Sequence, residues 1–438
     1  MTRADTIFAL ASAPGRAGVA VIRVSGPAAR DCVKVLIGQE IREVRQATLR
    51  TFRDSGGQAI DEGLVLWFEA PNSLTGEDVA EFQMHGGRAI VDALTTELAA
   101  VPGCRPAGPG EFTRRAVENG RLDLTQAEAI ADLVDAETEA QRRQAFRQKE
   151  GILGALYEGW RAELVRALAW AEAAIDFSDE DLPNVLIDAW HIANSVRDMI
   201  GAHLNDARRG ELVREGLFLT VIGPPNVGKS SLVNALAGRD VAIVSETAGT
   251  TRDVIEVRMD LGGYAVILAD TAGLRAARGK VEAEGVRRAL ARAETADLVL
   301  LLLDGSTGEN QDEIKENIVN KPSLTVWNKA DLPWPSGREG LKLSLKTGEG
   351  LDVLMEAITA KAKERLEAGG NSPVLTRPRH RHALMEAHAA LERASNVGEP
   401  ELFTEDLRLA LRAVGRITGR VDVEELLDTI FRDFCIGK

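Results

Sequence analysis

Residues 223–230 read GPPNVGKS and fit the pattern of a phosphate-binding loop, in which a lysine and a serine follow glycines. An apolar run of strand length precedes this segment, and a helical pattern follows it. Glycines let backbone N–H groups turn toward phosphate oxygens, and Lys229 adds a positive charge beside them. We therefore predict a nucleoside triphosphate site in which Ser230 is a magnesium ligand. The predicted phosphate contacts are Asn226, Val227, Gly228, Lys229, Ser230 and Ser231.

Two further motifs predict which base is bound. Residues 328–331 read NKAD and follow a run of strand-forming residues. A carboxylate at Asp331 can accept both N–H groups of the guanine edge, a pair of donors that adenine does not present, so the motif favours GTP over ATP. Residues 344–346 match the supporting base loop more loosely, because Leu345 replaces the usual alanine. The predicted base contacts are Asn328, Lys329, Asp331, Ser344, Leu345 and Lys346.

Two segments between these motifs have the features of the switches that sense a γ-phosphate. Residues 270–273 read DTAG and fit the acidic element that holds magnesium through water. Residues 249–253 read GTTRD and resemble the switch that closes on the γ-phosphate, with Thr251 as the second protein ligand to magnesium. The contacts predicted here are Ser245, Glu246, Thr247, Ala248, Gly249, Thr250, Thr251, Asp270, Thr271, Ala272 and Gly273.

The residue that orients the attacking water is not obvious from these motifs alone. Leu274 stands where Ras-like proteins carry a glutamine for this purpose. Arg275 and Arg278 are candidates for internal arginine fingers, although arginines in such segments are often simply solvated. Glu282 is the other candidate, because a carboxylate can position water directly or through a second water.

The elements that position these motifs divide the 438 residues into several expected domains. Residues 1–117 alternate strand-length runs, such as 19–24 and 64–68, with a single helix at 88–100, which predicts an α+β domain. Residues 118–210 are rich in alanine and helical. Residues 211–372 predict a parallel, doubly wound, Ras-like sheet carrying the phosphate loop. Its strands are expected at 217–222, 265–269, 298–303 and 324–327.

Helical periodicity returns over residues 373–438, so the α/β domain is predicted to be inserted into a helical domain. The expected fold class is therefore multidomain α/β and α. Hydrophobic residues make up 45% and charged residues 27%, which is typical of globular proteins. This composition argues against a coiled-coil rod and against a disordered chain.

Composition and charge also indicate the cellular compartment and limit the kinds of binding partner. Cys32, Cys104 and Cys435 are too few and too scattered for a disulfide framework or a zinc site, which indicates a reducing compartment. The net charge of −14 argues against a uniformly basic nucleic-acid surface. The longest purely apolar run is far shorter than the roughly 20 residues of a spanning helix, and no signal peptide is recognisable. We expect a cytoplasmic protein with no membrane partner.

Motifs outside the nucleotide site indicate a family. Together with the nucleotide-binding motifs, they make the whole chain resemble the MnmE (TrmE) family of bacterial tRNA-modification GTPases. The rival class is a regulatory GTPase of the ribosome-assembly type, which would share the nucleotide motifs but not these others. The motifs that carry the resemblance are DTI at 5–7, PGR at 14–16, GED at 76–78, HGG at 85–87, PGEF at 109–112, LDL at 122–124 and FCIGK at 434–438.

The resemblance implies a homodimer with an N-terminal folate-binding and dimerising domain, a helical domain built from both flanks, and an inserted G domain. It implies a partner, the FAD-dependent and NADH-dependent protein MnmG (GidA), in a heterotetrameric or larger complex. That complex would install an aminomethyl or carboxymethylaminomethyl group at C5 of the wobble uridine of tRNA. The added carbon would come from 5-formyltetrahydrofolate or methylene-tetrahydrofolate.

The resemblance also implies that G domains pair across the dimer and that potassium replaces an arginine finger. Glu282 matches the family's water-orienting residue and becomes the predicted catalytic residue. The predicted potassium ligands are Asn226, Ser245, Thr247 and Thr250.

For folate, the family pattern falls on Arg23, Glu81 and Lys438, with Arg121 where a lysine is common. Cys435 either approaches the transferred carbon or packs beside Phe434, and we favour the packed alternative. Two sets of arginines are candidates for tRNA phosphates, although solvated helix faces often have the same pattern. They are Arg377, Arg379 and Arg381, and the series Arg408, Arg412, Arg416 and Arg420.

Overall fold

The structure is a computed structural model that describes residues 5–177, 185–239, 241–243, 256–269, 295–307, 321–333, 339–367, 374–421, 424–432 and 434–437. The chain divides into two compact units. The first consists of Met1–Ala131, Gln148–Arg166 and Arg408–Lys438, and the second of Asp132–Arg147 and Ala167–Leu407. Each unit is built around its own β-sheet.

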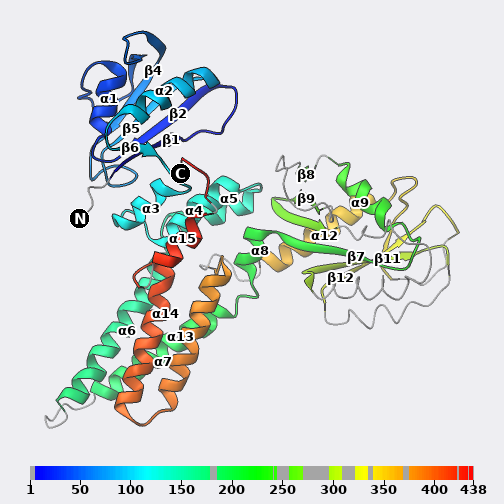
Figure 1. The fold of residues 1–438 in the computed structure, drawn as a ribbon. Coiled ribbons are helices and arrows are strands. Elements are labelled where there is room, and N and C mark those ends of the chain that lie inside the picture. The colour runs from blue at the N-terminus through cyan, green and yellow to red at the C-terminus, as the bar shows by residue number, and fades with distance from the viewer. Residues whose placement is uncertain are drawn as a thin grey trace, which may run out of the picture. The chain divides into compact units, whose positions relative to one another are not determined.

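The sheet of the first unit has six strands in the order β3-β4-β5-β2-β1-β6. Neighbouring strands are antiparallel except β1 and β6, which are parallel. Polar and apolar residues alternate along the strands, so one face carries the core and is covered by helices α1 (Ala29–Ile37) and α2 (Arg88–Ala100) (Figure 1). The strands are β1 (Thr6–Leu10), β2 (Ala17–Ser25), β3 (Thr48–Arg53), β4 (Ala59–Phe68), β5 (Val79–Gly86) and β6 (Cys104–Pro106).

The predicted helix at 88–100 coincides with α2, but the expectation of a single helix in this region is wrong. Helix α1 was missed, although it is amphipathic and buries Val33 and Leu36 against the sheet. The opposite face of the sheet is covered differently. There Phe112, in helix α3 (Glu111–Glu118), packs against Ile7 and Ala9 of β1.

Helices complete the first unit. Helix α15 (Glu424–Arg432) packs Leu427 and Phe431 against Leu124 and Ala127 of helix α4 (Leu124–Asp135). Four helices contribute residues to both units: α4, α5 (Glu139–Lys149), α6 (Ile152–Asp176) and α14 (Pro400–Thr418).

In the second unit, helices α7 (Val185–Leu204) and α13 (Pro378–Asn396) pack side by side (Figure 1). Alanines line the buried faces of both, because small side chains let helix backbones approach closely. The Ser395 hydroxyl donates to Asn194 Oδ1 at 2.7 Å and accepts from Arg197 at 2.9 Å, which adds polar bonds to the contact. Segments before and after the α/β region therefore meet.

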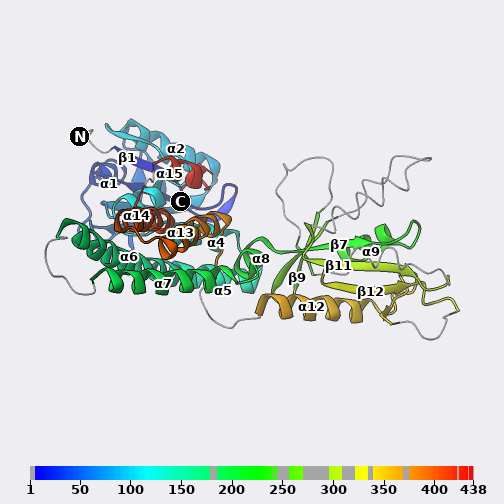
Figure 2. The ribbon, with the colours of Figure 1, turned by 90° about the horizontal axis from the view of Figure 1, so that it is seen from below.

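The sheet of the second unit has the order β13-β12-β11-β7-β10-β9-β8. Helices α9 (Lys229–Ala237) and α12 (Leu351–Glu367) pack on one face of it, and Figure 2 shows α12 running along the strands. The other face carries a second cluster around Val299 and Trp327. The strands are β7 (Leu217–Ile222), β8 (Ala242–Ile243), β9 (Glu256–Leu261), β10 (Tyr264–Ala269), β11 (Leu298–Asp304), β12 (Ser323–Asn328) and β13 (Leu341–Lys342).

The four predicted strands are all present, but the sheet is mixed rather than wholly parallel. Strand β9 is antiparallel to β10, and β8 is antiparallel to β9. The reason is the turn at Gly262 and Gly263, whose φ angles of 63° and 89° reverse the chain within two residues and leave no room for a crossover helix. The fold class, multidomain α/β and α, is confirmed. Among the helices that the structure describes, none has the length and apolar character needed to span a bilayer.

Candidate functional site

The predicted phosphate loop lies between the carboxyl end of β7 and the start of α9. Two of its glycines have backbone angles that other residues rarely adopt, with φ of 155° at Gly223 and 102° at Gly228. A Cβ atom at Gly223 would lie 2.0 Å from the Leu302 carbonyl oxygen, and one at Gly228 would lie 2.6 Å from Asn328 Nδ2. The loop therefore requires glycine at both positions for conformation and for space.

Lys229 crosses this loop. Its Nζ donates to the carbonyl oxygens of Gly223 at 2.8 Å and Pro224 at 2.7 Å, and burial lowers the pKa of its ammonium group. Because these acceptors are neutral, phosphate oxygens would be stronger partners for the same charge. Ser230 and Ser231 are exposed in the first turn of α9, where unpaired N–H groups and the helix dipole favour anions.

Asn328, at the end of β12, links the phosphate loop to the predicted base loops. It is buried; its Nδ2 donates to the Val227 carbonyl oxygen at 2.7 Å, and its Oδ1 accepts from the Leu345 N–H at 3.1 Å. Asp331 accepts a bond from the Ser344 hydroxyl at 2.8 Å and lies 3.9 Å from Lys346 Nζ. The structure therefore brings the predicted base contacts of the two loops together at one edge of the sheet.

Asp304 also lies at this edge and was not among the predicted residues. Its carboxylate accepts a 2.6 Å bond from Lys329 Nζ. Burial raises the pKa of Asp304, but the bonds from Lys329 and Ser306 outweigh burial, and the pKa lies below its usual value. Asp304 is the last residue of β11, as Asn328 is the last residue of β12. Because the carboxyl ends of neighbouring parallel strands meet at one edge, the position of Asp304 at the end of its strand could have indicated it.

Several predicted site residues lie outside the described residues, and their roles stay predictions. They are the catalytic candidate Glu282, the folate candidate Lys438, the region of Leu274, Arg275 and Arg278, and the switch residues Ser245, Glu246, Thr247, Ala248, Gly249, Thr250, Thr251, Asp270, Thr271, Ala272 and Gly273.

The predicted folate pair, Arg23 and Glu81, lies on the sheet face of the first unit that α1 and α2 do not cover. The two residues are directly opposite each other on β2 and β5. Arg23 Nε and Nη2 both reach Glu81 Oε1, at 2.9 and 2.8 Å, and the guanidinium lies 5.7 Å from the centre of the Phe112 ring. Both bonds end on Oε1 of the carboxylate. Among the described residues, none donates a hydrogen bond to the other oxygen, Oε2.

The segment 434–437 is part of the same unit. The Gly110 N–H donates to the Cys435 carbonyl oxygen at 3.3 Å, and Ile436 forms a β-bridge with Pro109. A Cβ atom at Gly437 would lie 2.2 Å from the Leu10 carbonyl oxygen, so the segment runs directly against the end of β1. Phe434 packs on Phe431, whereas the Cys435 side chain is exposed, which corrects the expectation of a packed cysteine.

Arg121 is exposed in the turn after α3, with its Cγ against Gly76. In the described part of the chain, no hydrogen bond or ion pair joins it to Arg23 or Glu81. Its predicted folate contact stays a prediction.

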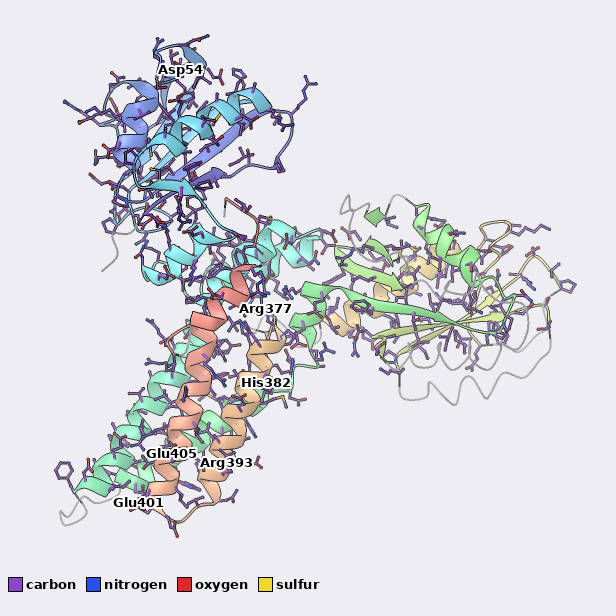
Figure 3. The ribbon with its side chains drawn as sticks, in the orientation of Figure 1. Asp54, Arg377, His382, Arg393, Glu401 and Glu405 are labelled. Atoms are coloured by element: carbon purple, nitrogen blue, oxygen red, sulfur yellow. The ribbon has the colours of Figure 1, made fainter. Side chains whose placement is uncertain are left out.

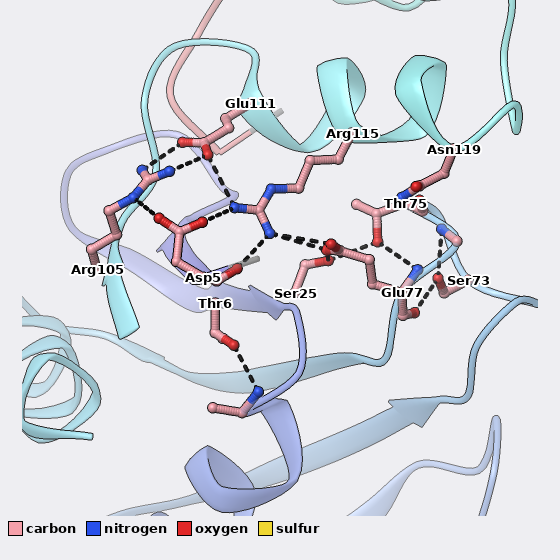
Figure 4. A network of polar contacts seen from close by, with 12 residues as sticks. Asp5, Thr6, Ser25, Ser73, Thr75, Glu77, Arg105, Glu111, Arg115 and Asn119 are labelled. Atoms are coloured by element: carbon pink, nitrogen blue, oxygen red, sulfur yellow. Dashed lines mark hydrogen bonds and ion pairs between the residues drawn. The ribbon is translucent and has the colours of Figure 1, made fainter. Parts of the chain in front are cut away.

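A network of charged residues fastens α3, and thereby Phe112, to the sheet (Figure 4). The Arg115 guanidinium is largely buried and bonds to the backbone and carboxylate of Asp5, both at 2.8 Å, and to Glu77 at 3.2 Å. Glu111 accepts bonds from Arg105 at 2.6 and 2.8 Å and from Arg115 at 3.2 Å. Three segments far apart in the chain are thus held to one helix.

Three of the arginines proposed for tRNA phosphates have acidic partners within the protein. Arg377 bonds to Asp132 at 2.7 Å, Arg381 bonds to Asp206 at 2.6 Å, and Arg420 lies 3.3 Å from Glu158. For Arg377 and Arg381 these pairs are mostly shielded from solvent, which contradicts the interpretation as a free basic surface. The remaining candidates also have interactions within the protein: Arg379, Arg408, Arg412 and Arg416.

A glycine-rich loop between a strand and a helix, bonded to an NKxD loop at the same sheet edge, defines the class of P-loop GTPases. The family model for the GTP-binding protein TrmE N-terminus matches residues 6–121, and that for the MnmE helical domain matches residues 124–435. The chain belongs to the MnmE (TrmE) family of tRNA-modification GTPases, as its motifs predicted, and is a GTPase.

Relatives match over nearly the whole length. The tRNA modification GTPase MnmE of Paramagnetospirillum magneticum is 54% identical over 441 residues, covering 99% of this chain and 100% of the relative. That of Parvibaculum lavamentivorans is 54% identical over 443 residues, with the same coverage. That of Rhodospirillum rubrum is 53% identical over 454 residues, covering 99% of each.

Proposed function

We propose that this chain is the GTP-hydrolysing subunit of a complex that builds the aminomethyl or carboxymethylaminomethyl group at C5 of the tRNA wobble uridine. Its partner would be the flavoprotein MnmG, which carries FAD and uses NADH, and its carbon donor a tetrahydrofolate. The observation that carries the proposal is the Arg23–Glu81 pair, in a unit that also contains residues 434–437, in a chain that belongs to a GTPase family. A GTPase that acted only as a switch would not need this second polar site.

For GTP, the residues fit a magnesium nucleotide. The Lys229 ammonium and the N–H groups of 226–231 would bind the phosphates, and Asp331 would bind guanine. The exposed Ser230 hydroxyl at the helix start, with Thr251, would hold magnesium, which neutralises charge on the phosphates. Glu282 would orient a water in line with the γ-phosphorus and accept its proton.

For potassium, Asn226 is suitably placed. It is exposed on the phosphate loop with φ of 61°, a left-handed conformation that asparagine tolerates well. Its side-chain oxygen, with ligands from Ser245, Thr247 and Thr250, would hold a cation beside the phosphates. We propose that this site is completed when two G domains of a homodimer pair, so that hydrolysis depends on both potassium and dimerisation.

For folate, Glu81 and Arg23 offer complementary chemistry. The Glu81 carboxylate can accept from the N–H groups of a pterin edge, and it is already oriented by Arg23. The cationic side chains of Arg121 and Lys438 would bind the carboxylates of the glutamate tail. Phe112 lies beneath Arg23 and supplies a rigid aromatic floor.

Mass spectrometry of wobble nucleosides tests the proposed function. Cells lacking the protein should contain uridine that is unmodified or only thiolated, and the intact gene should restore the modification. A gene carrying Lys229→Ala should not restore it, because the phosphates lose their main cation. An unchanged nucleoside profile together with a ribosomal-subunit defect would instead support a regulatory GTPase of ribosome assembly.

A further inference from the structure

The two connections between the nucleotide-binding region and the helical segments touch each other. The chain enters this region through α8 (Arg209–Glu215), and Leu375 lies shortly before α13 on the way out. A Cβ atom at Gly210 would lie only 2.2 Å from the Leu375 carbonyl oxygen. Only glycine permits this approach, so the incoming and outgoing segments are in direct backbone contact.

One carboxylate joins both connections. Asp132, near the end of α4, is 12% exposed, and its Oδ1 accepts from Arg214 Nε at 2.9 Å and from Arg377 Nη2 at 2.7 Å. Arg214 belongs to the incoming α8, and Arg377 is the residue before α13. Removing the charge of Asp132 would therefore weaken the hold on both segments at once.

A second ion-pair cluster also joins the incoming and outgoing connections. Arg381, in the first turn of α13, bonds to Asp206 at 2.6 Å and to Glu211 at 2.8 Å, and it also reaches the Leu204 carbonyl oxygen at 2.9 Å. Glu211 is 1% exposed and is further bonded by Arg208 at 2.7 Å. The outgoing helix is thereby tied to the end of α7 and to α8.

Helix α5 connects these segments to the sheet. Gln144 Nε2 donates to the Gly210 carbonyl oxygen at 2.8 Å, and Gln141 Nε2 donates to that of Arg214 at 3.0 Å. At the start of the same helix, the Ala140 N–H donates to the Gly263 carbonyl oxygen at 3.0 Å. Gly263 is in the turn between β9 and β10, and β10 leads directly to the predicted γ-phosphate element at Asp270.

These contacts form one polar assembly, the neck, which we define as Asp132, Gln141, Gln144, Asp206, Gly210, Glu211, Arg214, Arg377 and Arg381. None of its members is a predicted nucleotide or folate contact. Shielded ion pairs add little net stability, because desolvation offsets their attraction, but separating their partners is costly, so the pairs resist rearrangement. A connection fixed in this way passes a movement of one side to the other, whereas a loose connection absorbs it.

We infer that Asp132 is a positioning residue for tRNA modification: through Arg214 and Arg377 it holds both connections of the G domain, so that movement on GTP hydrolysis reaches the helical segments. The inference rests on the proposed function for its biological readout. Its structural readout, the rigidity of the neck, does not depend on that function.

The test uses the full chain carrying Asp132→Asn, which keeps the shape of the side chain and removes its charge. Spin labels are attached through unnatural amino acids at two exposed positions, 363 in α12 and 385 in α13. Electron–electron dipolar spectroscopy then measures the distribution of distances between the two labels. We expect the distribution to be about twice as wide as in the wild type, or wider. We expect GTPase turnover within about twofold of the wild type, and wobble-uridine modification by the chain with its partner about tenfold slower or worse.

Asp132→Glu keeps the carboxylate and should restore modification toward the wild-type rate. Arg393→Gln is the matched control, because Arg393 is also on α13 but lies far from Arg377 (Figure 3) and loses a 2.7 Å pair with Asp406 of α14. This control should leave the distance distribution and both activities unchanged.

Two results would overturn the inference. One is a wild-type distance distribution and modification rate in Asp132→Asn. The other is parallel loss of GTPase and modification with an unchanged distribution. If Asp132→Asn does not fold, Arg377→Lys decides in the same way, since it keeps a charge but loses the planar geometry. Failure of the proposed function is distinguishable, because the wild type would then modify no tRNA while the distance measurement still reports on the neck.

Discussion

Asn328 and Val227 are joined by a 2.7 Å hydrogen bond from the side-chain amide of one to the backbone carbonyl of the other, across 101 positions of the chain. The bond unites the loop that would select the base with the loop that would bind the phosphates. Because Asn328 also accepts from the Leu345 N–H, it orders three segments at once. We therefore expect Asn328 to shape the nucleotide site from within.

Replacing Asn328 by alanine should weaken GTP and GDP binding together. Two buried bonds are lost, each worth about 1 kcal/mol, so affinity should fall roughly 30-fold. Fluorescence titration with a labelled nucleotide measures the change. Asn396→Ala is the control, because Asn396 is exposed and, among the residues that the structure describes, its side chain bonds only to the Glu392 carbonyl oxygen of its own helix. Equal affinities for the two variants would contradict the proposed bridging role.

Asp331→Asn should change the preferred base from guanine to xanthine. The carboxylate can accept two N–H groups of guanine, whereas an amide offers one donor and one acceptor, which suits the carbonyl that xanthine has at that edge. GTP affinity should fall by about two orders of magnitude or more, since a site built for hydrogen bonds rejects a mismatched partner strongly. Competition between GTP and XTP for the labelled nucleotide measures this exchange. Retained preference for GTP would refute the assigned base contact.

The phosphate loop and the NKAD loop could be located from the sequence because each follows a largely apolar strand. The runs at 217–222, 298–303 and 324–327 are almost wholly apolar, as parallel strands covered on both faces must be, and the polar residues begin where the strands end. Conformation there is local, so residue types alone indicate it. The folate candidates depended on the family resemblance, since an arginine and a glutamate on separate strands have no local signature.

What could not be predicted depends on pairing between distant segments. Lys329 and Asp304 are 25 positions apart, and Arg115 and Asp5 are 110 apart. Charged residues of each kind are frequent along the chain, so the sequence does not indicate which will meet. The same holds for Arg377 and Arg381: their spacing suggested a solvent-facing stripe, whereas tertiary contacts place acidic partners against both.

Asn226→Ala should remove the response of the GTPase to potassium. In the wild type, hydrolysis should be faster in potassium than in sodium buffers, and the variant should hydrolyse GTP at the low sodium rate in both. Nucleotide affinity should change by about threefold or less, because the backbone N–H groups that bind phosphate are retained. Steady-state phosphate release in matched salts measures the rates. Equal wild-type rates in the two salts would refute a potassium site.

Glu81→Gln should weaken binding of 5-formyltetrahydrofolate by about tenfold or more, because the amide has one acceptor oxygen where the carboxylate has two, and because the ion pair with Arg23 is lost. Isothermal titration calorimetry measures the affinity. Arg30→Gln is a suitable control in the same sheet domain, since Arg30 makes an exposed pair with Glu69. If the two variants bind folate equally well, Glu81 is not a ligand-binding residue.

Arg115→Met should destabilise the first unit, because it leaves the carboxylates of Asp5, Glu77 and Glu111 without their shared cation. Breaking a shielded ion pair from one side costs about 3–5 kcal/mol, which corresponds to a loss of roughly 10 °C in melting temperature. Arg114→Met is the control on the same helix: Arg114 pairs with Glu118 and Asp428 nearer the surface, and exposed pairs contribute about 0–1 kcal/mol. Scanning calorimetry or circular dichroism measures both. Equal losses in the two variants would contradict the structural role of the network.

The difference in melting temperature between the wild type and Arg115→Met should also depend on pH. Burial raises the pKa of Glu111, but bonds from Arg105, the Gly108 N–H and Arg115 outweigh it, and the pKa lies below its usual value. The bond from Arg105 likewise holds the pKa of Asp5 below its usual value. Groups whose pKa is lowered in the folded state stabilise it above their unfolded pKa, and this contribution is lost as the pH falls through the folded value. The gap in melting temperature between the wild type and Arg115→Met should therefore be full at neutral pH and shrink below about pH 4.5, near the unfolded pKa of glutamate, as the carboxylates take up protons in both proteins.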